Sequence, residues 1–420
     1  MSVDTLKFLF VIPNYYPQLD IACVSDLINS TAIELTKKGH EVHIMNCLDA
    51  SSKKLKNCSS EFKAVCLNFE KAHIGLQIHT ITSPFKTVDS YFAYLFGSSA
   101  YSNHKLHQLV KEIKPDVVHF HAPMFFGHKI LYKKGNYLSV YTAHDYWFIC
   151  QRAYLLKKAK EPCKKQKNCL YCALRSGRPP QFGYYSFTFK RAVKSVDLIL
   201  TPSLKVKEIL STQLDNKIEC VPHFVPDTKQ FISPSGYSNF FLYAGTFDVH
   251  KGIFDLLEVF NKYSEIKEKL IIVGRGPLQV AIDNFIREHS LQDKVILLGF
   301  VDKSLLWSLY KDASALIVPS LNHDPCPTVI MEAFSVGTPV IGSDTGGIPE
   351  MVKRIDEALV FPAGNLENLA KILVAYDKRK YSANKIISIC QNYFSVEEYV
   401  KEYLAVLKSA FDSKLFRQQG

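Results

Sequence analysis

The sequence predicts an α/β protein made of two doubly wound domains, each with a parallel sheet covered by helices. Three observations support this fold class. The chain has 420 residues, which is more than a single hydrophobic core usually serves. Short apolar runs bounded by turn residues alternate with longer amphipathic segments, as strand–helix repeats do. The alternation stops before residue 228 and starts again at residue 240.

Nearly continuous apolar runs mark the expected strands, because strands that helices bury on both faces lose the usual polar alternation. In the first half of the chain we expect strands at 7–12, 41–45, 78–82, 117–120, 138–142, 198–200 and 219–221. In the second half we expect them at 240–244, 270–273, 295–298, 315–318, 339–341 and 359–361. Intervening segments such as 253–260 place apolar residues at helical spacing, so they predict helices that pack one face on a sheet.

The same pattern gives the domain boundaries. We expect a first domain over residues 1–227, a linker with Ser, Pro and Gly over 228–239, and a second domain over 240–395. Ligands of such sheets bind at the carboxyl ends of the strands. Two facing domains therefore predict a site in the cleft between them.

Charge is concentrated in one segment. The chain has 51 Lys and Arg against 40 Asp and Glu, a net charge of +11. The insertion at residues 150–194 holds 12 of these cations and one acid, Glu161, so it carries the whole excess. Such a surplus favours an anionic partner, which can be nucleotide phosphate, nucleic acid or a lipid surface.

Several classes of protein are disfavoured. No uncharged run reaches the ~20 residues that span a bilayer, and the N-terminal residues do not resemble a signal peptide. Most of the 11 cysteines are scattered within apolar segments, which favours a reducing, cytoplasmic setting over a disulfide scaffold.

Three strand-to-helix turns of the second half predict an anion site. They contain Gly245-Thr246, Gly274-Arg275-Gly276, and the segment from Pro319 to Thr328. Glycine lets the backbone approach a ligand closely, and free N–H groups at a helix start favour phosphate. Lys251 adds a positive charge near the first turn. For any one turn, close packing is an equal explanation of the glycine.

The third turn carries a more specific pattern. Glu332 lies eight residues after Asp324, within an otherwise apolar helix. A buried carboxylate needs a partner, and ribose hydroxyls would supply one. Helix capping explains Asp324 more readily than it explains Glu332.

The stretch DPCPTVIMEAFSVGTPVIGSDTGGIPE, residues 324–350, resembles the retaining glycosyltransferases of family 4. The likeness continues upstream in VGRGP and in Gly245 to Gly252, and it reaches the first domain more weakly. It implies the GT-B fold, in which two Rossmann-like domains face each other across a deep cleft. It also implies that the helix over 396–420 returns to the first domain.

The family's activity is the transfer of a sugar from a nucleotide-sugar donor (a UDP-, GDP- or ADP-sugar) to a glycan or lipid-linked acceptor. By this resemblance, Glu332 binds the ribose, the Thr328 and Val329 amides bind the diphosphate, and Asp324 holds sugar hydroxyls. Lys251 stabilises the departing diphosphate.

The donor site would also include Gly245, Thr246, Gly274 and Arg275. Asp324 stands where the family has glutamate, and Thr246 stands where it has arginine. Arg275 is the candidate to replace that positive charge.

Histidines end two neighbouring strands of the first half. His119 and His121 close one strand, and His144, followed by Asp145, closes the next. A lone histidine at a strand end is usually structural, but two adjacent strands that both end in histidine favour a position in the cleft. The family has His-x-His-x-Pro here, so the resemblance implies that His121 contacts the donor sugar. We expect His144 and Asp145 to orient the acceptor. The family's Gly-Gly after the first strand is missing from residues 14–22.

Four cysteines of the basic insertion form a candidate structural metal site: Cys150, Cys163, Cys169 and Cys172. The closing C-x-x-C has ligand spacing for zinc or an iron–sulfur cluster. The other spacings are irregular, so disulfides and incidental thiols stay open as alternatives. For the reaction itself no cofactor is expected, since the chain contains no Asp-x-Asp metal motif. The insertion resembles that of family members acting in surface-polysaccharide assembly.

Aromatic residues lie among the cations of the insertion, which suits an anionic membrane or single-stranded nucleic acid. A solvated basic face is the plainer alternative. We favour a membrane that carries the acceptor, with the protein peripheral on its cytoplasmic face. The rival functions are a sugar-nucleotide epimerase or hydrolase on the same fold, and a nucleic-acid-binding protein. The second rival leaves the motif of the second domain unexplained.

Overall fold

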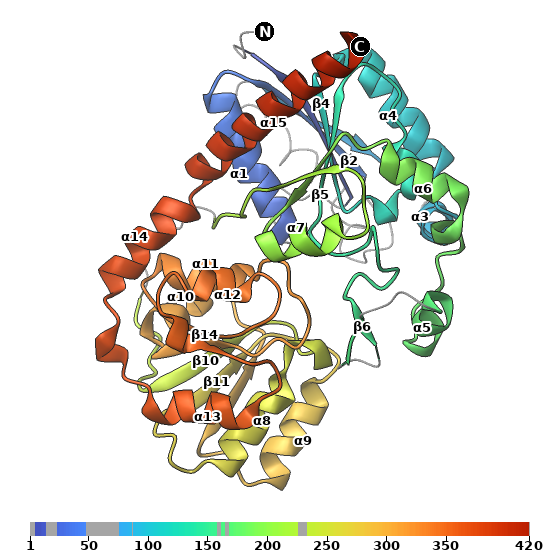
Figure 1. The fold of residues 1–420 in the computed structure, drawn as a ribbon. Coiled ribbons are helices and arrows are strands. Elements are labelled where there is room, and N and C mark those ends of the chain that lie inside the picture. The colour runs from blue at the N-terminus through green and yellow to red at the C-terminus, as the bar shows by residue number, and fades with distance from the viewer. Residues whose placement is uncertain are drawn as a thin grey trace.

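The computed structural model describes residues 5–13, 23–47, 75–85, 87–157, 161–163, 168–225 and 233–419. Two parallel sheets, of seven and six strands within these residues, form the centres of two domains (Figure 1). The predicted α/β class with two doubly wound sheets is therefore confirmed.

The first sheet has the order β3-β2-β1-β4-β5-β8-β9. Its strands are β1 (Lys7–Pro13), β2 (Glu41–Cys47), β3 (Leu76–Ile81), β4 (Val117–His121), β5 (Leu138–Thr142), β8 (Leu198–Thr201) and β9 (Lys217–Cys220). The chain winds outward from β1 in both directions, so the connecting helices lie on both faces of the sheet and bury it. Leu9 and Val11 belong to one core, and Phe8 and Phe10 belong to the other.

Helices cover both faces of this sheet. They are α1 (Cys23–Lys37), α3 (Thr87–Phe96), α4 (Ala100–Ile113), α6 (Phe187–Lys194) and α7 (Leu204–Ser211), with 3-10 turns η2 (Pro123–Phe125), η3 (His128–Leu131) and η4 (Phe182–Tyr185). Residues of α4 and α6 join the core on one face, and residues of α1 join the core on the other.

The second sheet has the order β12-β11-β10-β13-β14-β15. Its strands are β10 (Phe240–Ala244), β11 (Lys269–Val273), β12 (Val295–Gly299), β13 (Ala315–Val318), β14 (Val340–Ser343) and β15 (Val360–Phe361). Around it lie α8 (Ile253–Lys262), α9 (Gln279–Glu288), α10 (Lys303–Asp312), α11 (Thr328–Ser335), α12 (Ile348–Val352), α13 (Leu366–Ala375) and α14 (Ala383–Tyr393). The 3-10 turns are η5 (Val249–Lys251), η6 (Glu357–Leu359) and η7 (Lys378–Lys380).

The last helix, α15 (Val396–Gln419), packs on the first domain. Figure 1 shows it running from the second domain up the side of the first. Tyr399, Val400 and Tyr403 are buried in the first domain's core, and the Tyr403 hydroxyl lies 2.9 Å from Nδ1 of His119. Buried apolar side chains of α15 thus attach this C-terminal helix to the first domain.

The insertion contains a two-strand ribbon of β6 (Leu156–Lys157) and β7 (Glu161–Pro162), followed by the helix α5 (Cys169–Arg175). Sequence patterning did not predict these elements, because two-residue strands leave no periodic signal. Residues 158–160 and 164–167 of the insertion, and residues 226–232 at the end of the expected first domain and the start of the expected linker, lie outside the described residues. Within the described part, no helix has both the length and the apolarity to span a bilayer.

Candidate functional site

A cavity of about 260 Å³ opens at the carboxyl ends of β10 and β13. Its lining includes six residues that the sequence predicted for the donor site: Gly245, Thr246, Lys251, Asp324, Thr328 and Val329. They come from the turn after β10, from η5, from the loop after β13 and from the start of α11. The strand crossovers bring the turn after β10 and the segment before α11 together, because β10 and β13 are neighbours in the sheet.

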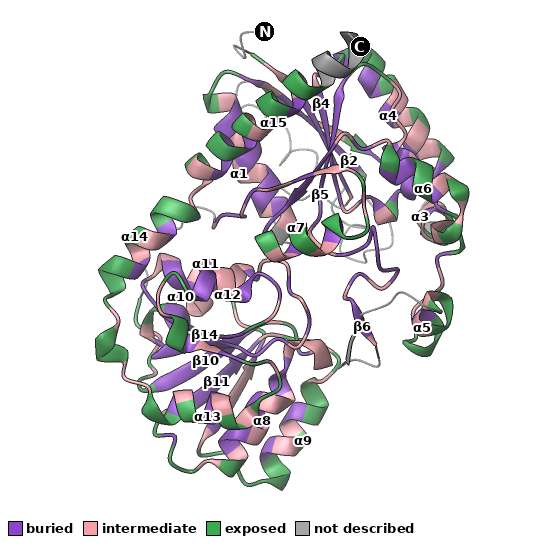
Figure 2. Ribbon diagram, viewed as in Figure 1, coloured by how far each residue is buried: buried purple, intermediate pink, exposed green. Residues whose placement is uncertain are grey.

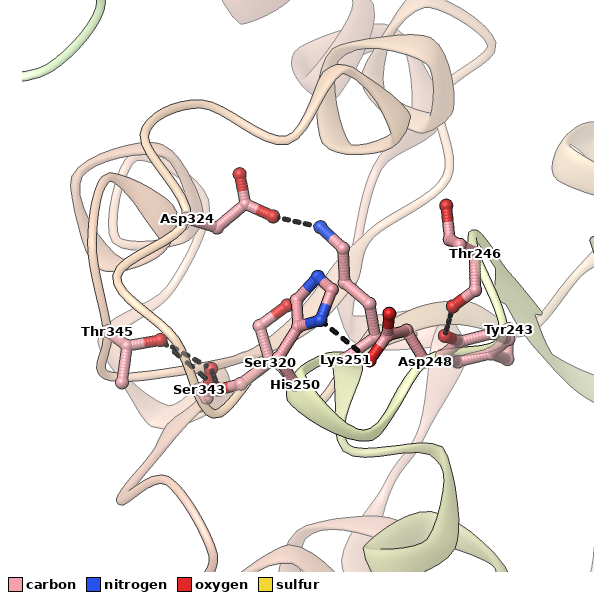
Figure 3. A network of polar contacts seen from close by, with 9 residues as sticks. All are labelled: Tyr243, Thr246, Asp248, His250, Lys251, Ser320, Asp324, Ser343 and Thr345. Atoms are coloured by element: carbon pink, nitrogen blue, oxygen red, sulfur yellow. Dashed lines mark hydrogen bonds and ion pairs between the residues drawn. The ribbon is translucent and has the colours of Figure 1, made fainter. Parts of the chain in front are cut away.

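Lys251 and Asp324 form an ion pair across this cavity (Figure 3). The Asp324 side chain is largely buried and that of Lys251 is about one-quarter exposed. A buried carboxylate is stable only with a partner, and the Lys251 ammonium supplies it. The cavity therefore holds a cation and an anion that neutralise each other.

The Gly-Gly pair of the motif places the Asp324 loop. Gly346 has a φ of +57°, and a side chain there would overlap the backbone of Asp324. The Gly347 amide donates to the Asp324 carbonyl at 2.9 Å. Only glycine permits this close approach, so the glycines act on the site through Asp324.

The glycines of the other two turns have different roles, since one serves close packing and the other lies at the cavity. A side chain at Gly274 would overlap the carbonyl of Gly245, so Gly274 packs one turn against the other. The atom nearest to where a Gly245 Cβ would lie is the Tyr243 hydroxyl oxygen, at 3.6 Å, and Gly245 lines the cavity. Arg275 is exposed and lies over the Phe300 ring, 4.9 Å from its centroid. Gly274 and Arg275 do not line this cavity.

Glu332 lies on α11, one turn after Thr328, and the lining of the cavity ends at Val329. The Tyr310 hydroxyl donates to its carboxylate at 2.7 Å. Burial raises the pKa of Glu332, while hydrogen bonds from Tyr310 and Thr328 act in the opposite direction. The carboxylate thus has a protein partner that sequence reasoning missed, because Tyr310 belongs to α10.

Three histidines of the first domain form a hydrogen-bonded chain. Nδ1 of His121 lies 2.8 Å from Nε2 of His144, and Nδ1 of His144 lies 3.2 Å from Nε2 of His223. Burial, and then the neighbouring imidazoles, lower the pKa values of His121 and His144 well below the usual range. Burial lowers that of His223 to about 4. The three imidazoles are therefore neutral near pH 7.

Nε2 of His121 is buried and has no hydrogen-bond partner. It is the free end of the chain of imidazoles. Sequence reasoning missed His223, although a signal existed. This histidine comes shortly after β9, much as His121 ends β4 and His144 comes shortly after β5.

Asp145 and Tyr146 continue from His144. An Asp145 carboxylate oxygen accepts the Trp147 amide at 2.8 Å, and burial raises the pKa of Asp145 to about 6. This bond ties Asp145 to its own turn. The Tyr146 hydroxyl is buried without a partner, and after burial the Asp324 and Glu350 carboxylates contribute most to raising its pKa. Tyr146 thus faces acidic groups of the second domain.

Glu350, the last residue of the motif, joins the two domains. Its carboxylate accepts the amides of Leu204 at 2.8 Å and Lys205 at 2.7 Å. These are unpaired N–H groups of the first turn of α7, which a carboxylate satisfies well. Sequence reasoning assigned Glu350 no role, since the start of α7 lies 145 residues earlier in the chain.

None of the four cysteines of the insertion forms a disulfide within the described residues. Within the described ranges, no three His, Cys, Asp or Glu side chains are grouped so that they could hold a metal ion. Burial and then the neighbouring Cys150 and Cys163 raise the pKa of Cys169, and Arg152 contacts the Cys172 sulfur at 3.7 Å. The zinc or iron–sulfur site stays a prediction from spacing. Residues 14–22, where the sequence lacks the family's Gly-Gly, lie outside the described residues.

Two family descriptions match the chain in succession. Residues 25–229 match Glycosyltransferase Family 4, and residues 226–392 match Glycosyl transferases group 1. Among relatives, an uncharacterized glycosyltransferase of Methanocaldococcus jannaschii, MJ1607, is 30% identical over 177 residues, 41% of this chain and 45% of the relative. The O-antigen chain mannosyltransferase RfbU of Salmonella typhimurium is 29% identical over 164 residues, 38% of this chain and 46% of the relative. The chain thus spans less than half the length of these relatives.

Solved structures show the same fold. Sucrose-phosphate synthase from Thermosynechococcus elongatus has a TM-score of 0.69 at 16% identity, covering 97% of this chain and 100% of that one. Anabaena Alr3699/HepE, solved in complex with UDP, has a TM-score of 0.63 at 15% identity, covering 96% and 100%. Given the motif, the two matched regions and the two facing sheets, the chain belongs to the glycosyltransferases of group 1 and family 4, with the GT-B fold.

Proposed function

We propose that the protein transfers a sugar from a nucleotide-sugar donor to a glycan or lipid-linked acceptor, with retention of the anomeric configuration. The observation that carries this proposal is the cavity of the second domain, where Lys251, Asp324 and the first residues of α11 meet. A cation, a carboxylate and free helix-start amides are the groups that a sugar joined to a diphosphate requires.

The donor is held by α11 and the turn after β10. The Thr328 and Val329 amides take the diphosphate at the positive end of the helix, and Gly245 leaves room for it. Glu332, one turn further on, accepts the ribose hydroxyls. The Anabaena protein solved with UDP-glucose supports a nucleotide sugar as donor for this fold.

Donor binding exchanges the partners of Lys251 and Asp324. Lys251 moves its charge to the diphosphate, and Asp324 is released to accept sugar hydroxyls. During transfer the bond between the anomeric carbon and the diphosphate breaks, a bond to the acceptor oxygen forms, and the proton of the acceptor hydroxyl passes to the departing diphosphate. Negative charge grows on the diphosphate, where a fixed ammonium lowers the barrier.

The histidines serve the other side of the cleft. His121 contacts the donor sugar through Nε2, its one free ring nitrogen, and stays neutral because it is buried. His144, which is partly exposed, and Asp145 orient the acceptor. Relatives named for O-antigen and colanic acid biosynthesis support a polysaccharide acceptor. We place the enzyme in the cytoplasm, peripheral on the inner face of the membrane.

A thermal-shift screen over UDP-, GDP- and ADP-sugars tests this function. A true donor at 100 times its Kd stabilises the folded protein by about 2.7 kcal/mol. Incubation of labelled donor without acceptor then separates the rivals, because an epimerase or hydrolase rearranges or releases the sugar and a transferase awaits its acceptor. No shift with any nucleotide sugar would contradict the proposal.

A further inference from the structure

Helix α3 carries its apolar stripe on the outside of the protein. Val88, Phe92 and Phe96 are spaced four residues apart, so they share one face of the helix. They are 59%, 54% and 50% exposed, while Ala93 is fully buried. A helix of a globular protein normally turns such a stripe toward the core. An outward stripe of large side chains marks a contact surface.

The stripe continues onto neighbouring elements. The Phe96 ring lies 5.4 Å from that of Phe92 and 6.1 Å from that of Phe182 on η4. Gly183 packs directly on the backbone of Phe96, with no space for a side chain. Phe187, the first residue of α6, is 77% exposed. Phe85, three residues before Val88, is 67% exposed. Together these five phenylalanines and one valine form a patch, called the aromatic patch and defined as Phe85, Val88, Phe92, Phe96, Phe182 and Phe187.

The helix that begins with Phe187 adds positive charge. Lys190, Arg191 and Lys194 of α6 are exposed. Neither α5, η4 nor α6 contains an acidic residue, and the one acid of α3, Asp89, accepts the Ser99 hydroxyl at 2.7 Å. Figure 2 shows exposed residues on α6, at the side of the first domain, and on α5 further down the same side of the molecule.

We propose that the aromatic patch docks the first domain on an anionic lipid bilayer, with its rings among the head groups and the α6 cations on the lipid phosphates. Aromatic side chains flanked by Lys and Arg, with Asp89 as the one acid on these elements, have the chemistry of interfacial membrane surfaces. The charge is complementary to anionic lipid and lies beside the apolar rings. This proposal rests on the proposed function, because a membrane-borne acceptor is what gives the enzyme a reason to bind a membrane. It adds the surface of the first domain that makes the contact.

The patch coincides only in part with the segment that the sequence indicated. Phe182, Phe187 and the cations of α6 belong to the basic insertion at residues 150–194, whereas α3 lies outside it. Of the insertion's lysines at 157, 158, 160, 164, 165 and 167, the structure describes only Lys157. Substitutions on α3 therefore test the patch separately from the insertion.

Sedimentation of the full chain with vesicles tests the proposal. The vesicles are of phosphatidylcholine alone or of phosphatidylcholine mixed with phosphatidylglycerol. The double variant Phe92→Ser/Phe96→Ser should bind mixed vesicles at least ~10-fold more weakly, since each buried ring favours the membrane. Lys190→Gln/Lys194→Gln should weaken binding ~fivefold or more and reduce its salt dependence. Val280→Ser is the control, since Val280 is 72% exposed on α9 of the other domain.

Loss of vesicle binding in both double variants, with Val280→Ser unchanged, establishes the patch. Failure of the wild-type chain to bind mixed vesicles, or unchanged binding by Phe92→Ser/Phe96→Ser, overturns the proposal. Self-association that disappears in the aromatic variant, without vesicle binding, also overturns it and makes the patch a protein interface. Melting temperatures confirm folding, and nucleotide-sugar thermal shifts of the same variants report separately on the proposed function.

Discussion

The ring of Tyr154 stacks on the imidazole of His250, with centroids 4.7 Å apart and ring planes 23° apart. Tyr154 belongs to the insertion of the first domain, and His250 immediately precedes Lys251 in the second. The Arg178 guanidinium lies 4.8 Å from the same tyrosine ring. The insertion therefore crosses to the second domain and supports the turn that carries the Lys251 ammonium.

Removal of this stack should loosen the Lys251 turn. Tyr154→Ala loses a ring contact worth about 0.5–1.5 kcal/mol, so we expect kcat/KM to fall by about threefold to tenfold. Tyr154→Phe keeps the ring and should retain activity, which makes it the matched control. Equal steady-state rates for the Ala variant and the wild type would show that the insertion does not support the turn.

Replacement of Lys251 should act on transfer more than on folding. Lys251→Ala removes the charge that meets the departing diphosphate, and we expect kcat to fall by about 10²–10³, as when one stabilising group of an active site is lost. Asp324→Asn should raise the donor KM, since the amide accepts sugar hydroxyls less well. An undiminished kcat in Lys251→Ala would show that Lys251 takes no part in the reaction.

Glu332 should control donor affinity. We expect Glu332→Ala to abolish both donor-induced thermal shift and transfer, because the ribose loses its acceptor. Tyr310→Phe is the informative partner variant. It removes one hydrogen bond to a buried carboxylate, costs about 1–3 kcal/mol of stability and leaves Glu332 in place to bind donor. Full activity of Glu332→Ala would refute the assignment.

Acidification should destabilise the protein through its buried histidines. The folded-state pKa of His223 is about 4, below the ordinary 6.5 of an exposed imidazole. The unfolded chain therefore binds the proton first, so this contribution is complete above pH 6.5 and is lost as pH falls toward 4.

For His223 alone the contribution is about 3 kcal/mol. Urea unfolding at pH 7 and pH 4.5 should show a smaller difference for His223→Asn than for the wild type. His104→Asn, which alters an exposed histidine, should keep the wild-type difference. A His223→Asn variant with the full wild-type difference would contradict the assignment.

Loss of the Glu350 contact should weaken the closed arrangement of the domains. Glu350→Gln replaces the charged cap of α7, with an expected cost of about 1 kcal/mol. We expect a larger radius of gyration in small-angle scattering, while Glu357→Gln, an exposed change on the same domain, leaves it unaltered. Identical scattering from Glu350→Gln and the wild type would show that the contact does not hold the domains together.

Local patterning was enough to predict most of the fold. The expected strand at 240–244 appears as Phe240–Ala244, and the one at 78–82 appears as Leu76–Ile81, shifted by one or two residues. Because these strands are buried on both faces, their consecutive residues are apolar, and such runs can be recognised locally in the sequence. The donor-site motif was readable for the same reason, since Asp324, Thr328 and Glu332 lie close together in the chain.

By itself, the sequence determined the two parallel sheets and the family, and it predicted the candidate donor-site residues that one continuous motif contains. Only the tertiary structure decided which distant groups meet: Lys251 with Asp324, Tyr310 with Glu332, and His223 with His144. It also decided that the α3 stripe faces outward. The physical reason is that periodicity reports whether a side chain is apolar, whereas the strand order and the crossovers decide what each strand end and helix face will contact.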